Sequence, residues 1–129
     1  MKPELLNGAN LAFIGDAYYE LYIRHHLLEK SITNQHELQR LSVEYVSARA
    51  HNIIVHGLEE NFSEEEAGIF KRGRNHKYNI SRKNLNREEY LNSSGFEALI
   101  GYLYLKEDYQ RLEFILNRAV EIIETSKTS

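Results

Sequence analysis

Large apolar and aromatic side chains recur every three or four residues along most of this chain, which is the spacing of one face of an α-helix. The series that begins at Leu11 and ends at Leu28 steps by 3, 4, 3, 4 and 3 residues, and it predicts a helix over about residues 9–29. The chain has only one proline among its 129 residues, and no segment shows the alternation typical of a half-buried strand. The sequence therefore predicts an all-α fold.

Further helices are predicted from the same periodicity, which brings the expected number to about five main helices. The second apolar series ends at Val55, and Gly57 is its expected stop. A short helix follows, then a longer apolar one over about residues 90–105, and last an amphipathic helix that covers the core. Capping residues mark the four starts: Asn34 with Glu37, Ser63 with Glu66, Asn86 with Glu89, and Asp108. We expect these helices to form a single domain over residues 1–129.

The composition excludes several kinds of site. The chain has no cysteine, which rules out a disulfide framework, a thiolate zinc site, an iron–sulfur cluster and a cysteine nucleophile, and favours a reducing, cytoplasmic setting. No stretch approaches the roughly 20 apolar residues of a membrane span, and the first residues lack an apolar run of signal length. We therefore expect a soluble cytoplasmic protein of mature length that does not engage a membrane.

Positive charge is concentrated in residues 71–87, a stretch with seven Lys and Arg residues and no acidic residue. The other 112 residues carry 9 basic and 19 acidic side chains. This imbalance predicts a basic loop that binds a polyanion, the alternative being a solvated loop that offsets an acidic body. Arg72 and Arg74 are the first candidates for phosphate contacts, because a guanidinium group pairs bidentately with phosphate. The full candidate set is Lys71, Arg72, Arg74, Asn75, Lys77, Arg82 and Lys83.

Two carboxylates stand inside otherwise apolar stretches, Asp16 after Gly15 and Glu97 before Gly101. An isolated ionised carboxylate in such surroundings is costly, so each acid must pair with a cation, bind a metal or face water. The two glycines allow a close helix approach that would bring Asp16 and Glu97 together. Magnesium relieves the repulsion between paired carboxylates and activates water for phosphodiester hydrolysis. Pairing of each acid with Lys or Arg is the alternative.

The stretch Leu11–Ala17 resembles the signature of the ribonuclease III catalytic domain, and Phe96–Gly101 resembles the second acidic motif of that family. The short chain and the stretch Phe70–Asn75 resemble one branch, Mini-ribonuclease III, which lacks a double-stranded-RNA-binding domain. The resemblance covers about residues 9–120. It implies a ribonuclease III-like endonuclease domain in which Asp16 and Glu97 bind Mg²⁺ and double-stranded RNA is hydrolysed to 5′-phosphate and 3′-hydroxyl ends.

The resemblance also implies a homodimer, in which Phe13 matches an aromatic residue that seats in the partner subunit. A core role for Phe13 within one chain is the alternative. For the Mini-ribonuclease III branch, the implied substrate is the precursor of the large-subunit (23S) ribosomal RNA. The implied setting is the assembling large ribosomal subunit.

The chain departs from the family pattern at two positions, because Ala12 and Ser94 stand where longer family members have acids. Ser94, Glu20 or Asn92 is expected to complete the shell of the ion through water, although a salt bridge with Arg24 is an alternative role for Glu20. Two rival functions stay open, the first suggested by these departures and the second by the helical periodicity alone. One is a non-catalytic duplex-RNA-binding ribosome-assembly factor, and the other is a helical adaptor between proteins.

Overall fold

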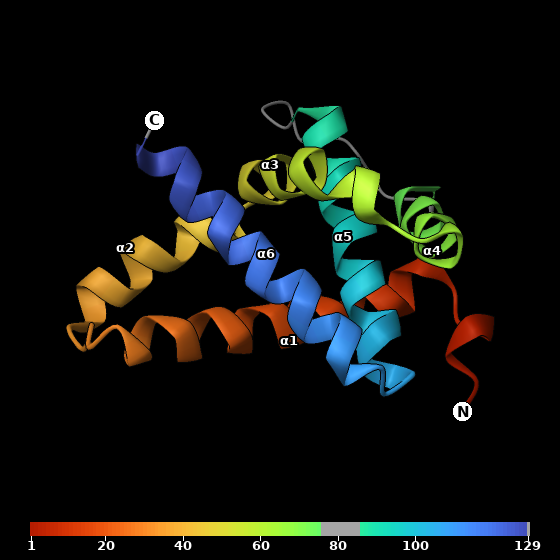
Figure 1. Ribbon diagram of the computed structural model, residues 1–129, viewed down its shortest axis with the longest axis horizontal. Coiled ribbons are helices and arrows are strands. Elements are labelled where there is room, and N and C mark those ends of the chain that lie inside the picture. Colours follow the sequence, from red (N-terminus) through yellow and green to blue (C-terminus); the bar gives the residue numbers. More distant parts are fainter. Residues whose placement is uncertain (76–85, 129) are drawn as a thin grey trace.

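The computed structural model describes residues 1–75 and 86–128, and within those ranges it contains helices and no strand (Figure 1). The elements run in the order η1 (Pro3–Leu5), α1 (Gly8–Glu29), α2 (Gln35–Val46), α3 (Ala48–Leu58), η2 (Glu59–Asn61), α4 (Glu64–Asn75), α5 (Arg87–Leu105) and α6 (Tyr109–Thr128). The prediction of an all-α fold is confirmed. Among the described helices, none combines the length and the apolar character needed to cross a lipid bilayer.

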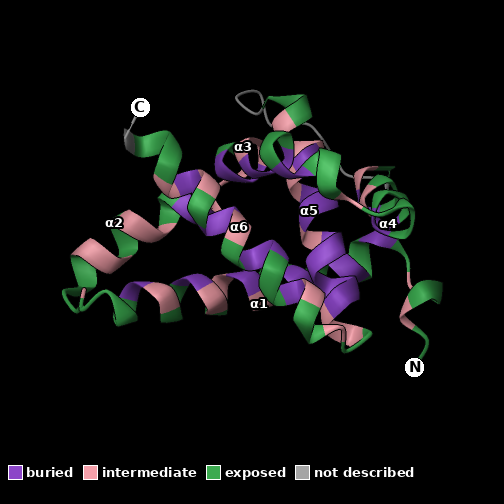
Figure 2. Cartoon of the chain, viewed as in Figure 1, coloured by how far each residue is buried: buried purple, intermediate pink, exposed green. Residues whose placement is uncertain are grey.

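Helix α5 is the centre of the fold. Its second half is largely apolar and buried, with Glu97 as its acidic residue, as expected for a helix covered on most sides by others, and α1, α3, α4 and α6 all pack against it. Figure 1 shows α6 running diagonally across the front of the molecule, and in Figure 2 buried residues are present along α1, α5 and α6. The core therefore lies around α5, with α6 as its cover.

Helices α1 and α5 cross in direct backbone contact. A Cβ atom on Gly15 would overlap the carbonyl oxygen of Glu97, and a Cβ atom on Gly101 would overlap the carbonyl oxygen of Leu11. Any side chain at either glycine would push the helices apart, since neither backbone can yield without disturbing its own helix. The sequence-based expectation that these two glycines permit a close approach is confirmed.

The second predicted helix proved to be two helices, α2 and α3. Ser47 separates them with an extended backbone (φ −68°, ψ 160°), and its hydroxyl accepts a hydrogen bond from the backbone N–H of Ala50, which caps α3. The apolar spacing continues across this break, so periodicity alone did not reveal it. Gly57 does not end the second helix, because α3 continues to Leu58 and Gly57 packs closely against Ile122 of α6.

The predicted capping residues all act as such. Ser63 and Glu66 form a complete capping box: the backbone N–H of Glu66 donates to Ser63 Oγ at 3.1 Å, and the backbone N–H of Ser63 donates to Glu66 Oε1 at 2.9 Å. The other caps accept from the backbone three residues later: Asn34 from Glu37, Asn86 from Glu89, and Asp108 from Arg111.

The basic stretch is not a loop over its whole length, as the sequence had suggested. Residues 71–75 form the end of α4, and Arg87 is the first residue of α5. The positively charged end of α4 is consistent with the helix dipole, which favours cations near a helix C-terminus. Lys77, Arg82 and Lys83 lie outside the described residues.

Candidate active site at the crossing of α1 and α5

The crossing brings together the two acids that the sequence singled out. Asp16 directly follows Gly15 on α1, and Glu97 precedes Gly101 by one turn on α5, so both side chains start beside the backbone contact. Their carboxyl groups share a hydrogen bond. Asp16 is exposed and Glu97 is half-buried, which makes the pair accessible from one side and closed by the core on the other.

This environment holds a proton on Glu97. Burial, the hydrogen bond to Asp16, the charge of Asp16 and the charge of Glu20 together raise the pKa of Glu97 to about 9. At neutral pH Glu97 is therefore protonated, which avoids the repulsion that a second negative charge beside Asp16 would cause. A cation bound between the carboxylates would replace that proton.

The donor set at the crossing suits a hard divalent cation. Asp16 and Glu97 offer carboxylate oxygens, and oxygen ligands are those that magnesium prefers. Among the described residues, no three acidic or histidine side chains close around one point. An ion held by Asp16 and Glu97 would thus keep water in most of its positions, as magnesium commonly does.

The positions that depart from the family pattern are part of the core. Ala12 is buried. Ser94 is buried as well, and its hydroxyl donates to the carbonyl oxygen of Gly73 at 2.9 Å, which ties α5 to the end of α4. The side chain of Asn92 bonds to Arg74 and Asn52. The contacts of Ser94 and Asn92 are thus made with neighbouring helices.

Glu20 forms the salt bridge with Arg24 that was one of its two expected roles, and it also lies close enough to act on Glu97 by its charge. It lies one turn after Asp16 on α1, and its charge contributes to the raised pKa of Glu97, so it belongs to the electrostatic surroundings of the acidic pair. It also forms the predicted salt bridge with Arg24, at 3.7 Å between Oε1 and Nη2. Both groups are largely exposed, so this salt bridge adds little stability.

Buried rings from three helices pack together beside residue 96, the neighbour of Glu97 in the sequence. The ring of His51 on α3 contacts Tyr19 of α1 and Phe96 of α5, each with ring centroids 5.1 Å apart. Burial lowers the pKa of His51 to about 3, so the ring is neutral, and its Nδ1 shares a 2.7 Å hydrogen bond with Ser93 Oγ. His51 was not predicted to be buried. The signal that could have shown it is its place on a helix beside apolar residues such as Ala50 and Ile54.

Phe13 projects from α1 into solvent. Its exposed fraction is 81%, which contradicts a core role within one chain. It lies three residues before Asp16, almost one helical turn away. An aromatic ring left in water forgoes about 1.5–3 kcal/mol of burial, so this position is suited to contact with another molecule.

The basic residues at the end of α4 are held by neutral oxygens. The Arg72 guanidinium donates through Nη1 to the backbone carbonyls of Glu4 at 2.9 Å and Leu6 at 3.0 Å, and Arg74 Nη1 donates to the amide oxygen of Asn92. Lys71 and Asn75 are exposed. None of the ion pairs among the described residues involves any of these cations.

Most other cations in the described part of the chain are paired with carboxylates. These pairs are Arg24–Glu20, Lys30–Glu124, Arg40–Glu37, Lys106–Glu65, Arg111–Glu66, Arg118–Glu121 and Lys127–Glu44. Among the described residues, the end of α4 therefore presents cations that form no ion pair with a carboxylate, whereas most cations elsewhere are paired. An anion is the natural complement of such a surface.

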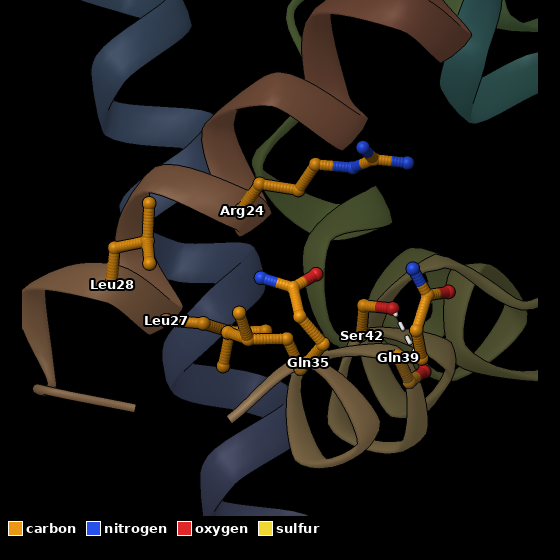
Figure 3. Close-up of a pocket in the computed structure, with 7 residues that line it drawn as sticks. Arg24, Leu27, Leu28, Gln35, Gln39 and Ser42 are labelled. Atoms are coloured by element: carbon orange, nitrogen blue, oxygen red, sulfur yellow. Dashed lines mark hydrogen bonds between the residues drawn. The ribbon is translucent and has the colours of Figure 1, made fainter. Parts of the chain in front are cut away.

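A separate groove lies between the second half of α1 and α2 (Figure 3). Figure 3 shows Leu27 and Leu28 of α1 on one side and Gln35, Gln39 and Ser42 of α2 on the other. Neither Asp16 nor Glu97 lines this groove. The groove is thus distinct from the acidic pair.

Comparison with known proteins identifies the family of the chain. The family model described as Ribonuclease III domain matches residues 9–108, a range that contains both acids. A Mini-ribonuclease 3 from Streptococcus pneumoniae is 42% identical over 122 residues, which cover 93% of this chain and 95% of that protein. A Mini-ribonuclease 3 from Clostridium tetani is 38% identical over 122 residues, with 94% and 81% covered.

A solved structure gives the same result for the fold. The crystal structure of a protein from Fusobacterium nucleatum superposes with a TM-score of 0.81 at 29% sequence identity, over 91% of this chain and 93% of that chain. The sequence match and the shared fold extend over the helices that carry both acids. The chain therefore belongs to the ribonuclease III domain family and is an endoribonuclease of that type.

Proposed function

We propose that this protein is a magnesium-dependent endoribonuclease that cleaves double-stranded RNA, with Asp16 and Glu97 as the residues that hold the ion. The observation that carries the proposal is the meeting of the two carboxyl groups at the crossing of α1 and α5, where the pKa of Glu97 rises to about 9. A carboxyl pair that retains a proton in the absence of a cation is a site that a divalent ion stabilises.

The chemistry follows from the two acids and their surroundings. Mg²⁺ supplies a water of lowered pKa and offsets the negative charge that develops on the phosphate. Asp16 and Glu97 fix the position of the ion, and Glu20 adds negative charge beside it. Water attacks phosphorus and the bond to the 3′-oxygen breaks, so the products carry a 5′-phosphate and a 3′-hydroxyl. No covalent intermediate with the protein is needed.

The end of α4 supplies the contact with the RNA backbone. Lys71, Arg72, Arg74 and Asn75 present donors and positive charge that the described carboxylates leave uncompensated. Duplex RNA is recognised mainly by shape through its phosphates and 2′-hydroxyl groups, which such side chains contact without reading bases. Lys77, Arg82 and Lys83 continue the basic stretch in the sequence, and we include them in the proposed surface.

The working form in this proposal is a homodimer. Phe13 is exposed and lies almost one turn from Asp16, so a partner subunit that covers this ring would lie beside the acidic pair. Two-fold symmetry then places one acidic pair from each subunit on a shared duplex, one for each strand.

For the natural substrate we propose the precursor of the 23S ribosomal RNA in the cytoplasm, processed on the assembling large ribosomal subunit. The support is the likeness to the Mini-ribonuclease III branch together with the phosphate-binding character of α4. A second candidate function is a non-catalytic duplex-RNA-binding assembly factor. It is favoured by Ala12 and Ser94, because the Ser94 hydroxyl is bonded to Gly73 within the core.

One experiment separates these two functions. Purified protein is incubated with a long duplex RNA, with and without Mg²⁺, beside single-stranded RNA and duplex DNA, and the Glu97→Gln variant serves as control. We expect Mg²⁺-dependent cleavage of duplex RNA alone, and loss of cleavage in the variant. Tight binding of the duplex without cleavage under Mg²⁺ would overturn the nuclease proposal and support the assembly factor.

A further inference from the structure

Three polar side chains from three helices form a chain of hydrogen bonds at the end of α4. Arg74 of α4 donates through Nη1 to the Oδ1 atom of Asn92 on α5. Asn92 in turn donates through Nδ2 to the Oδ1 atom of Asn52 on α3, at 2.7 Å. The side chain that begins this chain belongs to the proposed RNA-binding surface, and the middle one lies on the same helix as Glu97.

The two bonds fix the orientation of the Asn92 amide group. Asn92 is only 5% exposed, so its oxygen and its NH₂ group each need a partner inside the protein. A flip of the amide would place its NH₂ group against the Arg74 guanidinium and its oxygen against the oxygen of Asn52, and both contacts would then be lost. Asn92 is thus a fixed acceptor aimed at Arg74.

The choice of a neutral acceptor has an electrostatic consequence. Arg111 is held by the carboxylate of Glu66 and Arg118 by that of Glu121, so their charges are compensated within the protein. Arg74 is half-buried and is also held by a side chain of the protein, but this partner is the neutral amide of Asn92. The anchor uses one edge of the guanidinium group, which carries five N–H donors in all, and the full positive charge is retained.

We propose that Asn92 and Asn52 are positioning residues that hold the Arg74 guanidinium in place, without neutralising it, to bind one phosphate of the RNA backbone. This inference rests on the proposed function, because it assumes that RNA binds at the end of α4. It predicts that the charge state of residue 92, rather than its shape, determines how strongly Arg74 binds phosphate.

The test is the Asn92→Asp variant, which keeps the size of the side chain and its bond to Arg74 but pairs the guanidinium with a carboxylate. Binding to a short blunt duplex RNA is measured in EDTA, so that no cleavage occurs, over a series of salt concentrations. We expect about tenfold weaker binding, and a slope of log K against log salt that is smaller by roughly one per subunit. The aspartate cannot donate to Asn52 as the Asn92 amide does, so the thermal unfolding midpoint of the variant is measured as well, and binding is compared at a temperature at which both proteins are folded.

Two controls isolate the role of Arg74. Asn117→Asp on α6 makes the same chemical change at an exposed amide that accepts from the Tyr22 hydroxyl, and it should leave RNA affinity within about twofold of the parent, because an exposed distant charge is screened by salt. Asn92→Asp is also made together with Arg74→Ala. If residue 92 acts through Arg74, the second change should add little to the loss caused by Arg74→Ala alone.

The outcomes are distinguishable. Two results would overturn the inference while leaving the proposed function intact. One is unchanged RNA affinity in a folded Asn92→Asp variant. The other is a loss of affinity from Asn92→Asp that is as large in the Arg74→Ala background as in the parent. Failure of the parent protein itself to bind duplex RNA would instead overturn the proposed function.

Discussion

Glu66 and Glu97 are both glutamates set into the interior of the fold, and their surroundings are opposite. Glu66 is 4% exposed and accepts hydrogen bonds from the Ser63 backbone and from Arg111 at 2.7 and 2.9 Å. Although burial acts to raise the pKa of Glu66, these donors hold it below its usual value. Glu97 faces Asp16 instead, and its pKa rises to about 9.

The two glutamates differ in their partners: the carboxylate of Glu66 is paired and stabilises the fold, whereas that of Glu97 is proposed to bind the catalytic ion. A buried charge that is fully paired within the chain has no capacity left for a ligand. A half-buried acid whose nearest polar partner is another acid is destabilising until a proton or a cation arrives. The following predictions test whether Glu66 serves the stability of the fold and Glu97 serves RNA cleavage.

The largest effect is expected at Glu97. Glu97→Gln removes a metal ligand, and the rate of duplex RNA cleavage should fall by more than about a hundredfold, since even residues that only support ligands cost 10–100-fold. The free energy of unfolding should not fall, because the change removes an acid that burial penalises. Cleavage assays and denaturant unfolding of the same preparation check both statements, and undiminished cleavage would refute the assignment of Glu97.

Gly15→Ala should destabilise the fold by about 3 kcal/mol, because its Cβ atom would overlap the Glu97 carbonyl oxygen and force α1 away from α5. Gly68→Ala is the matched control. A Cβ atom there meets no neighbour within 4 Å, and the change should stabilise α4 by about 0.5–1 kcal/mol. Denaturant unfolding of both variants measures the difference, and equal effects would show that the crossing is not tight.

Arg111→Ala should lower the free energy of unfolding by about 2 kcal/mol. The change leaves the buried carboxylate of Glu66 without its cationic partner. Because Arg111 is partly exposed, the loss of stability is smaller than for a fully buried pair. Cleavage by the folded fraction should be unchanged at low temperature. A loss of activity beyond the loss of folded protein would mean that this ion pair also serves the active site.

The two glutamates should affect the pH dependence of stability with opposite sign. Glu97 has a raised pKa in the folded state, so its contribution is present below about pH 4.5, the usual value, and is lost as pH rises toward about 9. Glu66 has a lowered pKa, so its contribution is present above about pH 4.5 and is lost as pH falls further.

Thermal unfolding in EDTA between pH 5 and pH 9 tests this expectation. The midpoint should decline with rising pH in the parent protein and decline less in Glu97→Gln. Added Mg²⁺ should stabilise the parent most at the alkaline end, where no proton competes. A midpoint that declines equally in both proteins would show that Glu97 does not cause the slope.

The sequence predicted the crossing of α1 and α5 because glycine beside an acid in an apolar helix is a local signal. The helix caps were predicted for the same reason, since a cap and its partner lie three residues apart. The break at Ser47 was missed because the apolar spacing continues through it. The contacts of the two arginines at the end of α4 were not predicted. Arg74 binds Asn92, and Arg72 binds the carbonyls of Glu4 and Leu6. These residues are distant in sequence, and a single sequence contains no local pattern that indicates such pairs.

The glycine contact between α1 and α5 also bears on how sequences in this family can change. Because the main chains themselves touch, the separation of Asp16 and Glu97 does not depend on how neighbouring side chains pack. A change of side chain at position 12 or 94 would therefore alter the surroundings of the two acids without altering the separation of the helices that carry them. The contact between the main chains fixes that separation.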